Sequence, residues 1–214
     1  WLTGFAEGLK YDQKKYGLTL IGGDTVATPG PLLLNVVAIG EVPQGRMLRR
    51  AHAKVGDDVW VTGTIGDAAL GLRILRGDAL ALSDRHRASL VARYRVPEPR
   101  VTAGQGILPI AHACLDVSDG LVADCGHMAE ASKVGIELRA TDIPLSPATQ
   151  AAIANERANL ADLLTAGDDY ELVFTAAPAH RARLTTLAAK IKVRFTRIGK
   201  VAKGRGVRVY APDG

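Results

Sequence analysis

Cysteine and aromatic residues are scarce in this chain of 214 residues. It contains two cysteines, Cys114 and Cys125, and phenylalanine, tryptophan and tyrosine together account for 5% of its residues. Two cysteines outside a CxxC pair cannot build a disulfide framework, and this scarcity is typical of proteins from a reducing compartment. We therefore expect a cytoplasmic protein whose core is built from alanine, valine, leucine and isoleucine.

Long apolar runs and several well-known catalytic motifs are also missing. No run reaches the roughly 18 apolar residues that a membrane span needs, so we expect no membrane partner. The phosphate-binding sequence GxxxxGK[ST] does not occur, which excludes a P-loop nucleotide hydrolase. Neither a GxSxG elbow nor an HExxH or Cys/His zinc spacing is present, so serine-hydrolase and zinc chemistry are not indicated.

The charge balance is basic, but the basic residues are not concentrated. Lysine and arginine number 27 against 22 acidic residues, so the formal net charge is +5. The arginines between residues 85 and 100 are spread over an expected helix and loop without forming one dense patch. This distribution favours a solvated basic surface, and we expect no nucleic-acid partner.

The first part of the chain predicts a helix followed by two strands. Apolar residues recur at helical spacing over residues 1–16, and Gly17 ends the pattern. Residues 18–21 form a short apolar run, and residues 32–40 form a nearly continuous one, which is typical of a strand buried on both faces. A proline and a glycine within residues 43–45 then break the pattern. We place a domain boundary there and expect two domains, residues 1–44 and residues 45–214.

The remainder of the chain mixes short apolar runs with amphipathic segments, which predicts a layered domain of strands and helices. We expect strands at residues 58–62, 113–117, 134–138, 170–175, 193–201 and 207–210. We expect helices at residues 66–75, 83–94, 102–112, 119–132, 147–155 and 178–190. The predicted fold class is α+β, with the elements arranged as a layered α/β sandwich.

The strongest local signal is the sequence DVSDGL at residues 116–121, which joins an expected strand to an expected helix. Asp116 and Ser118 would share one face if the chain stays extended, and Asp119 and Asp124 follow closely. The carboxylates could hold a hard cation such as Mg²⁺, while N–H groups at the helix start could bind a phosphate. The alternative is purely structural: Ser118 would cap the helix and Asp119 would be an acid of its first turn.

Two further acidic turns and one basic pair are candidates. The sequence GGDT at residues 22–25 follows an expected strand, and paired glycines allow close approach to a phosphate. The sequence GDDYEL at residues 167–172 places two acids just before another strand. Arg50, next to Arg49, could bind a phosphate bidentately. Taken singly, each also fits an ordinary turn or a surface basic pair.

The order of these motifs changes their weight. GGDT, then Arg50, then DVSDGL, then GDDYEL resembles the thiamine-monophosphate kinase family, within the wider group of aminoimidazole ribonucleotide synthetase-like enzymes. The resemblance runs from Trp1 to about Gly206 and includes the sequence PEPR at residues 97–100. It implies the C-terminal domain of that group for residues 45–214. For residues 1–44 it implies a remnant of the N-terminal ATP-binding and dimerisation domain.

The resemblance implies an ATP- and Mg²⁺-dependent transfer of a phosphoryl group to thiamine monophosphate, which gives thiamine diphosphate. It implies no acid or base catalyst, since the acceptor is already an anionic phosphate oxygen. It also implies a homodimer. The matching positions are Asp24, Asp116 and Asp119 for magnesium, Gly23, Asp24, Arg50 and Ser118 for ATP, and Asp168 and Asp169 for thiamine monophosphate.

The chain departs from the family pattern at three points. The usual GEDYEL reads GDDYEL, which keeps an acid. An upstream segment with further metal-binding aspartates and a C-terminal aromatic that stacks on the substrate have no counterpart in these residues. We therefore expect the parent protein to be the kinase and these residues alone to turn over poorly. The alternatives are a sister synthetase of the same group, and a nucleotide-binding or partner-binding module without turnover.

Overall fold

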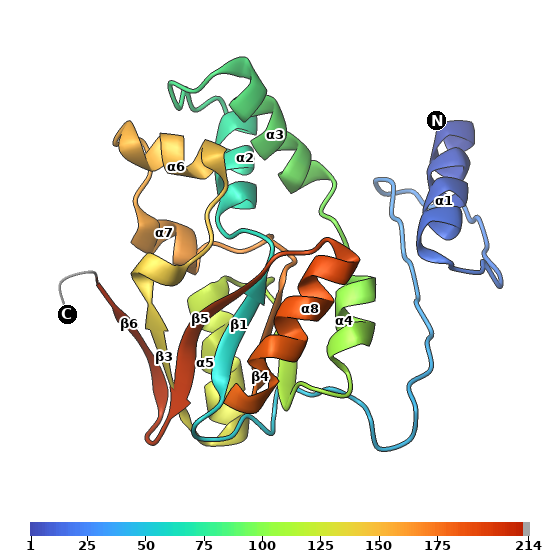
Figure 1. The fold of residues 1–214 in the computed structure, drawn as a ribbon. Helices are drawn as coiled ribbons and strands as arrows, with labels where there is room; N and C mark the ends of the chain where they lie inside the picture. The colour runs from blue at the N-terminus through green and yellow to red at the C-terminus, as the bar shows by residue number, and fades with distance from the viewer. Residues whose placement is uncertain (212–214) are drawn as a thin grey trace. The chain divides into compact units, whose positions relative to one another are not determined.

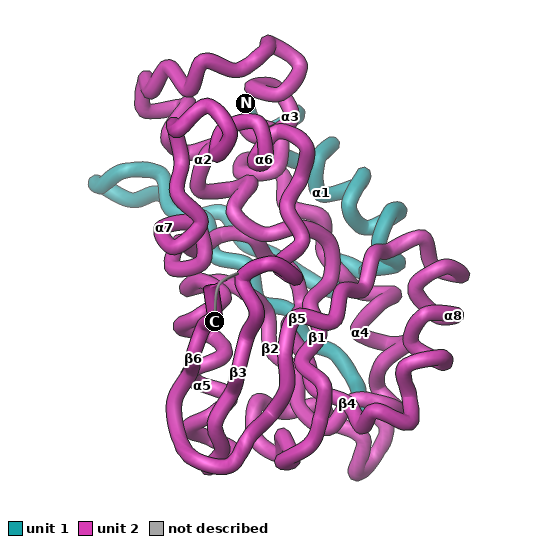
Figure 2. Tube along the Cα trace, turned by 60° about the vertical axis from the view of Figure 1, so that its left-hand side comes forward, with its two compact units in different colours: residues 1–42 teal, residues 43–214 magenta. Residues whose placement is uncertain are grey.

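The computed structural model describes residues 1–211 and divides the chain into two compact units. Unit 1 is Trp1–Val42 and unit 2 is Pro43–Gly214, coloured separately in Figure 2. The division falls two residues before the boundary predicted after residue 44. Residues 212–214, the last three of the predicted second domain, lie outside the described residues.

Unit 1 contains one helix, α1 (Leu2–Tyr16), within its residues. Gly17 ends it in the left-handed conformation, with φ of 68°. Glycine adopts this conformation without steric cost. The predicted helix and its end are therefore confirmed.

The two strands predicted in unit 1 are wrong. Residues 18–21 and 32–40 belong to no strand of the described chain. Their apolar side chains are exposed rather than buried, as at Ile21 and Leu33, each 81% exposed. A strand needs a neighbouring strand to satisfy its N–H and C=O groups, and the described residues provide none for these segments.

Unit 2 is built on a mixed sheet of six strands in the order β2-β4-β1-β5-β3-β6. The pairs β2–β4, β4–β1, β1–β5 and β5–β3 are antiparallel, whereas β3 and β6 are parallel. The strands are β1 (Asp58–Thr62), β2 (Ala113–Asp116), β3 (Gly135–Arg139), β4 (Leu172–Ala176), β5 (Phe195–Ala202) and β6 (Gly206–Tyr210). The predicted α+β class and layered arrangement are confirmed.

Helices cover both faces of this sheet (Figure 1). Side chains alternate along β1, so Val59 and Val61 join one core cluster and Trp60 joins another. The helix α5 (Leu121–Ser132) packs on the first face. The helices α4 (Val101–Ile107) and α8 (Arg181–Ile191) pack on the second.

A third apolar cluster joins the remaining helices beyond one end of the sheet (Figure 1). They are α2 (Asp67–Leu75), α3 (Asp84–Arg95), α6 (Pro147–Ala154) and α7 (Leu160–Thr165), and two 3₁₀ turns lie at Ala140–Asp142 and Pro178–His180. Leu70, Leu90 and Leu163 are buried there. Among residues 1–211 no helix is both long enough and apolar enough to cross a membrane.

Candidate functional site

The DVSDGL turn connects β2 to α5, and its acids differ sharply in exposure. Asp116 ends β2 with an exposed side chain, and the Asp119 side chain is 65% exposed. Ser118 is half-buried, while Asp124 is buried inside the first turn of α5. Asp116 and Asp119 are thus the two acids of this turn that a ligand in solvent can reach.

Asp124 holds the turn in shape. Its Oδ2 accepts hydrogen bonds from the backbone N–H groups of Ser118, Asp119 and Gly120 at 3.0, 3.1 and 3.1 Å. The alternative with Ser118 as the helix cap is wrong, because α5 begins at Leu121 after Gly120 and these N–H groups bond to Asp124. The sequence suggested that N–H groups at the helix start could bind a phosphate. These three are not free to do so, because they already donate to Asp124. Burial is the main cause that raises the pKa of the Asp124 carboxyl.

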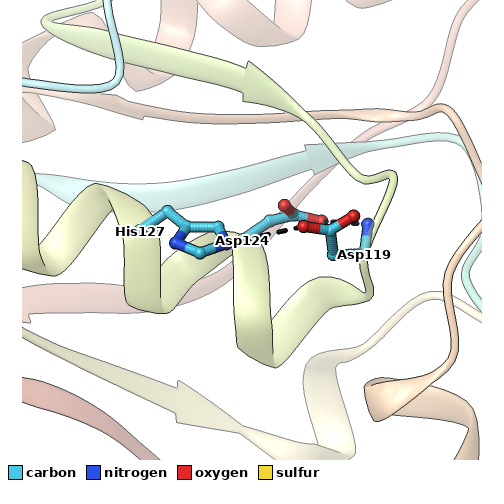
Figure 3. Close-up of side chains that lie close together, drawn as sticks. All are labelled: Asp119, Asp124 and His127. Carbon is cyan, nitrogen blue, oxygen red and sulfur yellow. Dashed lines mark hydrogen bonds and ion pairs between the residues drawn. The ribbon is translucent and has the colours of Figure 1, made fainter.

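Asp119, Asp124 and His127 form an acidic and imidazole group at the start of α5 (Figure 3). One possible ligand atom from each lies within 4.8 Å of the others, and His127 Nε2 lies 3.5 Å from Asp119 Oδ2. Magnesium prefers oxygen ligands, and the Asp124 carboxylate is already bonded to the backbone. Asp119 is therefore the member of this group that offers an exposed carboxylate, and Asp116, at the end of β2, is not one of its members. The magnesium assignment of Asp116 and Asp119 stays a prediction.

The GDDYEL loop lies directly against the DVSDGL turn. Backbone hydrogen bonds join Asp168 N–H to Ser118 C=O at 3.0 Å, and Tyr170 N–H to Val117 C=O at 2.8 Å. A Cβ on Gly167 would collide with the carbonyl oxygen of Ser118, so the close approach requires glycine. The two motifs, distant in sequence, are held in one place by these contacts.

Asp168 is the accessible acid of this loop. Its backbone has φ of 69°, and that of Tyr170 has φ of 50°, both in the left-handed region that non-glycine residues rarely adopt. Strained backbone of this kind concentrates at functional loops. The Tyr170 hydroxyl donates to Asp168 Oδ1 at 3.2 Å, and this bond is the main cause that raises the Tyr170 pKa.

Asp169 points the other way, into the protein. Its side chain is fully buried, and its two oxygens accept hydrogen bonds from the N–H groups of Gly66 at 2.8 Å and Ala68 at 3.3 Å. The carboxyl thus satisfies donors at the start of α2. Burial raises its pKa to about 7. This geometry contradicts a direct contact between Asp169 and a substrate, and the substrate prediction now rests on Asp168.

Glu171 is a structural centre that the sequence analysis missed. It is buried, and its carboxylate accepts bonds from Thr62 Oγ1 at 2.6 Å, from Arg93 at 3.0 Å and from two nitrogens of Arg100. A Cβ on Gly63 would collide with this carboxylate. Arg100, which binds Glu171, belongs to the sequence PEPR, and the sequence analysis noted PEPR only as part of the family pattern.

The remaining predicted residues lie elsewhere in the chain. Gly23 and Asp24 belong to unit 1, where both are exposed and Asp24 Oδ1 accepts from the Thr25 N–H at 2.8 Å. Arg50 is exposed in unit 2, and its carbonyl accepts from the Ser132 hydroxyl at 3.3 Å. No described contact of the Arg50 side chain tests its role, so the ATP and metal assignments of these residues stay predictions.

Comparison with known proteins now decides the family. The model of AIR synthase related protein, C-terminal domain, matches residues 54–212. The chain belongs to this family. The expected fold, that of the aminoimidazole ribonucleotide synthetase-like C-terminal domain, is thereby confirmed, whereas the bounds given to the two domains stay a prediction.

Among curated proteins the chain is similar to thiamine-monophosphate kinases. It is 38% identical over 209 residues to that of Caulobacter vibrioides, covering 96% of this chain and 58% of the relative. It is also 38% identical over 201 residues to that of Escherichia coli K12, covering 94% and 61%. The chain therefore spans about three-fifths of the length of these relatives.

Solved structures give the same likeness. The thiamine-monophosphate kinase of Stenotrophomonas maltophilia aligns with a TM-score of 0.69 at 42% identity, covering 78% of this chain and 54% of that one. A structure described as AaThiL complexed with AMPPCP and TMP aligns with a TM-score of 0.66 at 32% identity, covering 76% and 50%. The hydrogenase maturation protein HypE of Escherichia coli, at 23% identity and a TM-score of 0.57, shares the fold alone.

Proposed function

We propose that this chain is part of a thiamine-monophosphate kinase, which transfers the γ-phosphoryl group of ATP to thiamine monophosphate and releases ADP and thiamine diphosphate. The similarity to thiamine-monophosphate kinases along 94–96% of the chain carries the proposal. AaThiL, at 32% identity, has been seen with AMPPCP, an ATP analogue, and with TMP. Both fit a protein that brings a nucleotide and thiamine monophosphate together.

The residues predicted for the site take separate roles in this proposal. Asp116 and Asp119, with Asp24, would hold magnesium, because they offer exposed carboxylate oxygens. When bound, magnesium neutralises charge on the transferring phosphates. Gly23, Asp24, Arg50 and Ser118 would contact ATP. Asp168 would face the permanently cationic thiazolium ring of thiamine monophosphate.

The chain's own contribution to the reaction is positioning. The acceptor is a phosphate oxygen that is already anionic, so no general base is needed to create the nucleophile. What the loops must do is keep several carboxylates fixed while two anionic substrates approach each other. Three N–H bonds to Asp124 and the backbone bonds between the loops provide that rigidity.

Two finer features belong to the same proposal. The parent protein would act as a homodimer, as the family resemblance implies. It would act in the cytoplasm, where unpaired cysteines such as Cys114 and Cys125 persist.

The test uses the intact parent protein with ATP, Mg²⁺ and thiamine monophosphate, and follows thiamine diphosphate by chromatography. We expect turnover that requires all three components. Binding of ATP without any thiamine diphosphate would instead favour a nucleotide-binding module. Turnover with a different phosphate acceptor but not with thiamine monophosphate would favour a sister synthetase.

A further inference from the structure

A hollow of about 490 Å³, lined by both polar and apolar side chains, lies between α2, α3 and α6. These helices lie together beyond one end of the sheet (Figure 1). Helix α3 contributes Arg85, His86, Ser89 and Arg93, whose spacing of one, four and eight residues places them on one face of the helix. None of these residues was assigned a role by the sequence motifs or by the proposed function.

Arg93 supplies the strongest reason to expect a ligand. Its Nη2 donates to the carbonyl of Asp169 at 2.9 Å and to Glu171 Oε1 at 3.0 Å. Its Nη1 is buried and has no hydrogen-bond partner within residues 1–211. A buried guanidinium donor without an acceptor is unfavourable, and a bound anion would remove that cost.

The charges around the hollow favour an anion. Arg85 is exposed, and its side chain makes no hydrogen bond or ion pair with any described residue. Asp67 is the acid that also lines the hollow. It is 97% buried, and its oxygens already accept bonds from the hydroxyls of Thr64, Ser146 and Thr149 at 2.6–2.7 Å. These donors are neutral hydroxyls, so Asp67 keeps its negative charge, and the guanidinium groups of Arg85 and Arg93 outnumber it at the hollow.

We propose that this hollow binds the phosphate group of a small molecule, held by Arg85 and Arg93 with His86 beside them. A planar guanidinium matches a phosphate with two parallel N–H bonds, which favours arginine at such sites. The volume admits a phosphate with several further atoms attached. Arg93 also donates hydrogen bonds to Asp169 and Glu171 of the GDDYEL loop. A ligand bound to Arg93 would therefore contact a side chain that holds this loop.

Inorganic phosphate titrated into the purified chain tests this site, with backbone amide shifts as the readout. We expect saturable shifts at residues 85–93 and at the start of α6. Arg85→Gln should weaken this binding roughly fivefold or more, because one charged phosphate contact is lost. The matched control is Arg87→Gln, on the same helix but outside the hollow, and it should leave the affinity within about twofold.

Three outcomes would overturn the proposal. Equal weakening by the two substitutions would mean that phosphate binds a diffuse basic surface. Saturable shifts confined to residues 116–121 would mean that phosphate binds the acidic turn and not the hollow. Acetate that produced the same shifts with equal affinity would mean that the hollow takes a carboxylate and not a phosphate.

Discussion

Asp119 and Asp124 lie five residues apart at the start of α5 but have different partners. Asp119 is exposed and has His127 as its neighbour, whereas Asp124 is buried and accepts three backbone N–H bonds. In the intact parent protein, Asp119→Asn should lower kcat by roughly 10²-fold or more, as for the loss of one strong electrostatic stabiliser. Its free energy of unfolding should change by less than about 0.5 kcal/mol, as for other surface substitutions.

Asp124→Ala is the matched comparison. It leaves three N–H groups without their acceptor, so the free energy of unfolding should fall by about 1–3 kcal/mol. Urea unfolding and steady-state kinetics on both variants separate the two roles. A normal kcat in Asp119→Asn would remove Asp119 from the metal site.

Asp168 and Asp169 offer a second contrast between neighbours. Asp168→Ala in the parent protein should raise KM for thiamine monophosphate about 5- to 30-fold, equivalent to about 1–2 kcal/mol, with KM for ATP nearly unchanged. The reason is the accessible carboxylate opposite a cationic ring. Asp169→Ala should instead lower the melting temperature, because its side chain is fully buried. If Asp169→Ala alone moved KM for thiamine monophosphate, the assignment to Asp168 would be wrong.

Asp169 accepts hydrogen bonds from the N–H groups of Gly66 and Ala68 at the start of α2, and burial raises the pKa of its carboxyl to about 7. The stability of this helix start therefore depends on pH. An unfolded aspartate titrates near 3.8, so between about pH 4 and 7 the folded state binds more protons at Asp169 than the unfolded state. The stability contributed by this group is therefore fully present below about pH 4. It is lost as the pH rises to about 7, by up to about 4 kcal/mol.

Comparison with Asp169→Asn isolates this effect, because asparagine does not titrate. The free energy of unfolding of the unsubstituted chain, minus that of the variant, should decline between pH 4 and 7 in urea titrations. A difference that stayed flat would show that Asp169 titrates normally. A difference that rose with pH would show that the bonds from Gly66 and Ala68 hold the carboxylate ionised.

Most elements of unit 2 could be predicted from the sequence because local pattern and tertiary environment agree there. Residues 58–62 alternate between two apolar faces, and β1 has the predicted bounds. Residues 32–40 show why local pattern is insufficient: an apolar run becomes a strand only when another strand pairs with it. Helix α7 was not predicted, because a segment of six residues is too short to show the helical spacing of apolar residues.

At the scale of the whole chain, the sequence indicated which motifs matter but not how they are joined. The acids of DVSDGL and GDDYEL were identified as candidates, yet the side that each faces depends on tertiary contacts. Asp168 and Asp169 are adjacent in sequence, but Asp169 is buried against the N–H groups of Gly66 and Ala68 while Asp168 is accessible. Glu171 directly precedes β4, Arg93 lies in α3 and Arg100 directly precedes α4, and no local pattern predicts that they meet.

The two apolar clusters on opposite faces of the sheet should unfold together. Val59 and Trp60 are neighbours on β1 but belong to different clusters, so neither cluster can lose its strands without disturbing the other. Met128→Ala removes a fully buried side chain on the α5 face, and it should lower the free energy of unfolding by about 2–5 kcal/mol. The fluorescence of Trp60, which stacks with Phe174 on the opposite face, should report the same shift.

Trp1→Phe provides the background in which this measurement is made, since Trp1 and Trp60 are the two tryptophans of the chain. Glu130→Ala, at an exposed position of the same helix, is the control and should change the free energy by less than about 0.5 kcal/mol. Urea transitions followed by Trp60 fluorescence and by far-ultraviolet circular dichroism should coincide in every variant. In Met128→Ala, the Trp60 transition could stay at the same urea concentration while the dichroism transition moved to a lower one. That outcome would mean that the two faces unfold separately, because the loss of packing at α5 would leave the cluster beneath α4 and α8 unchanged.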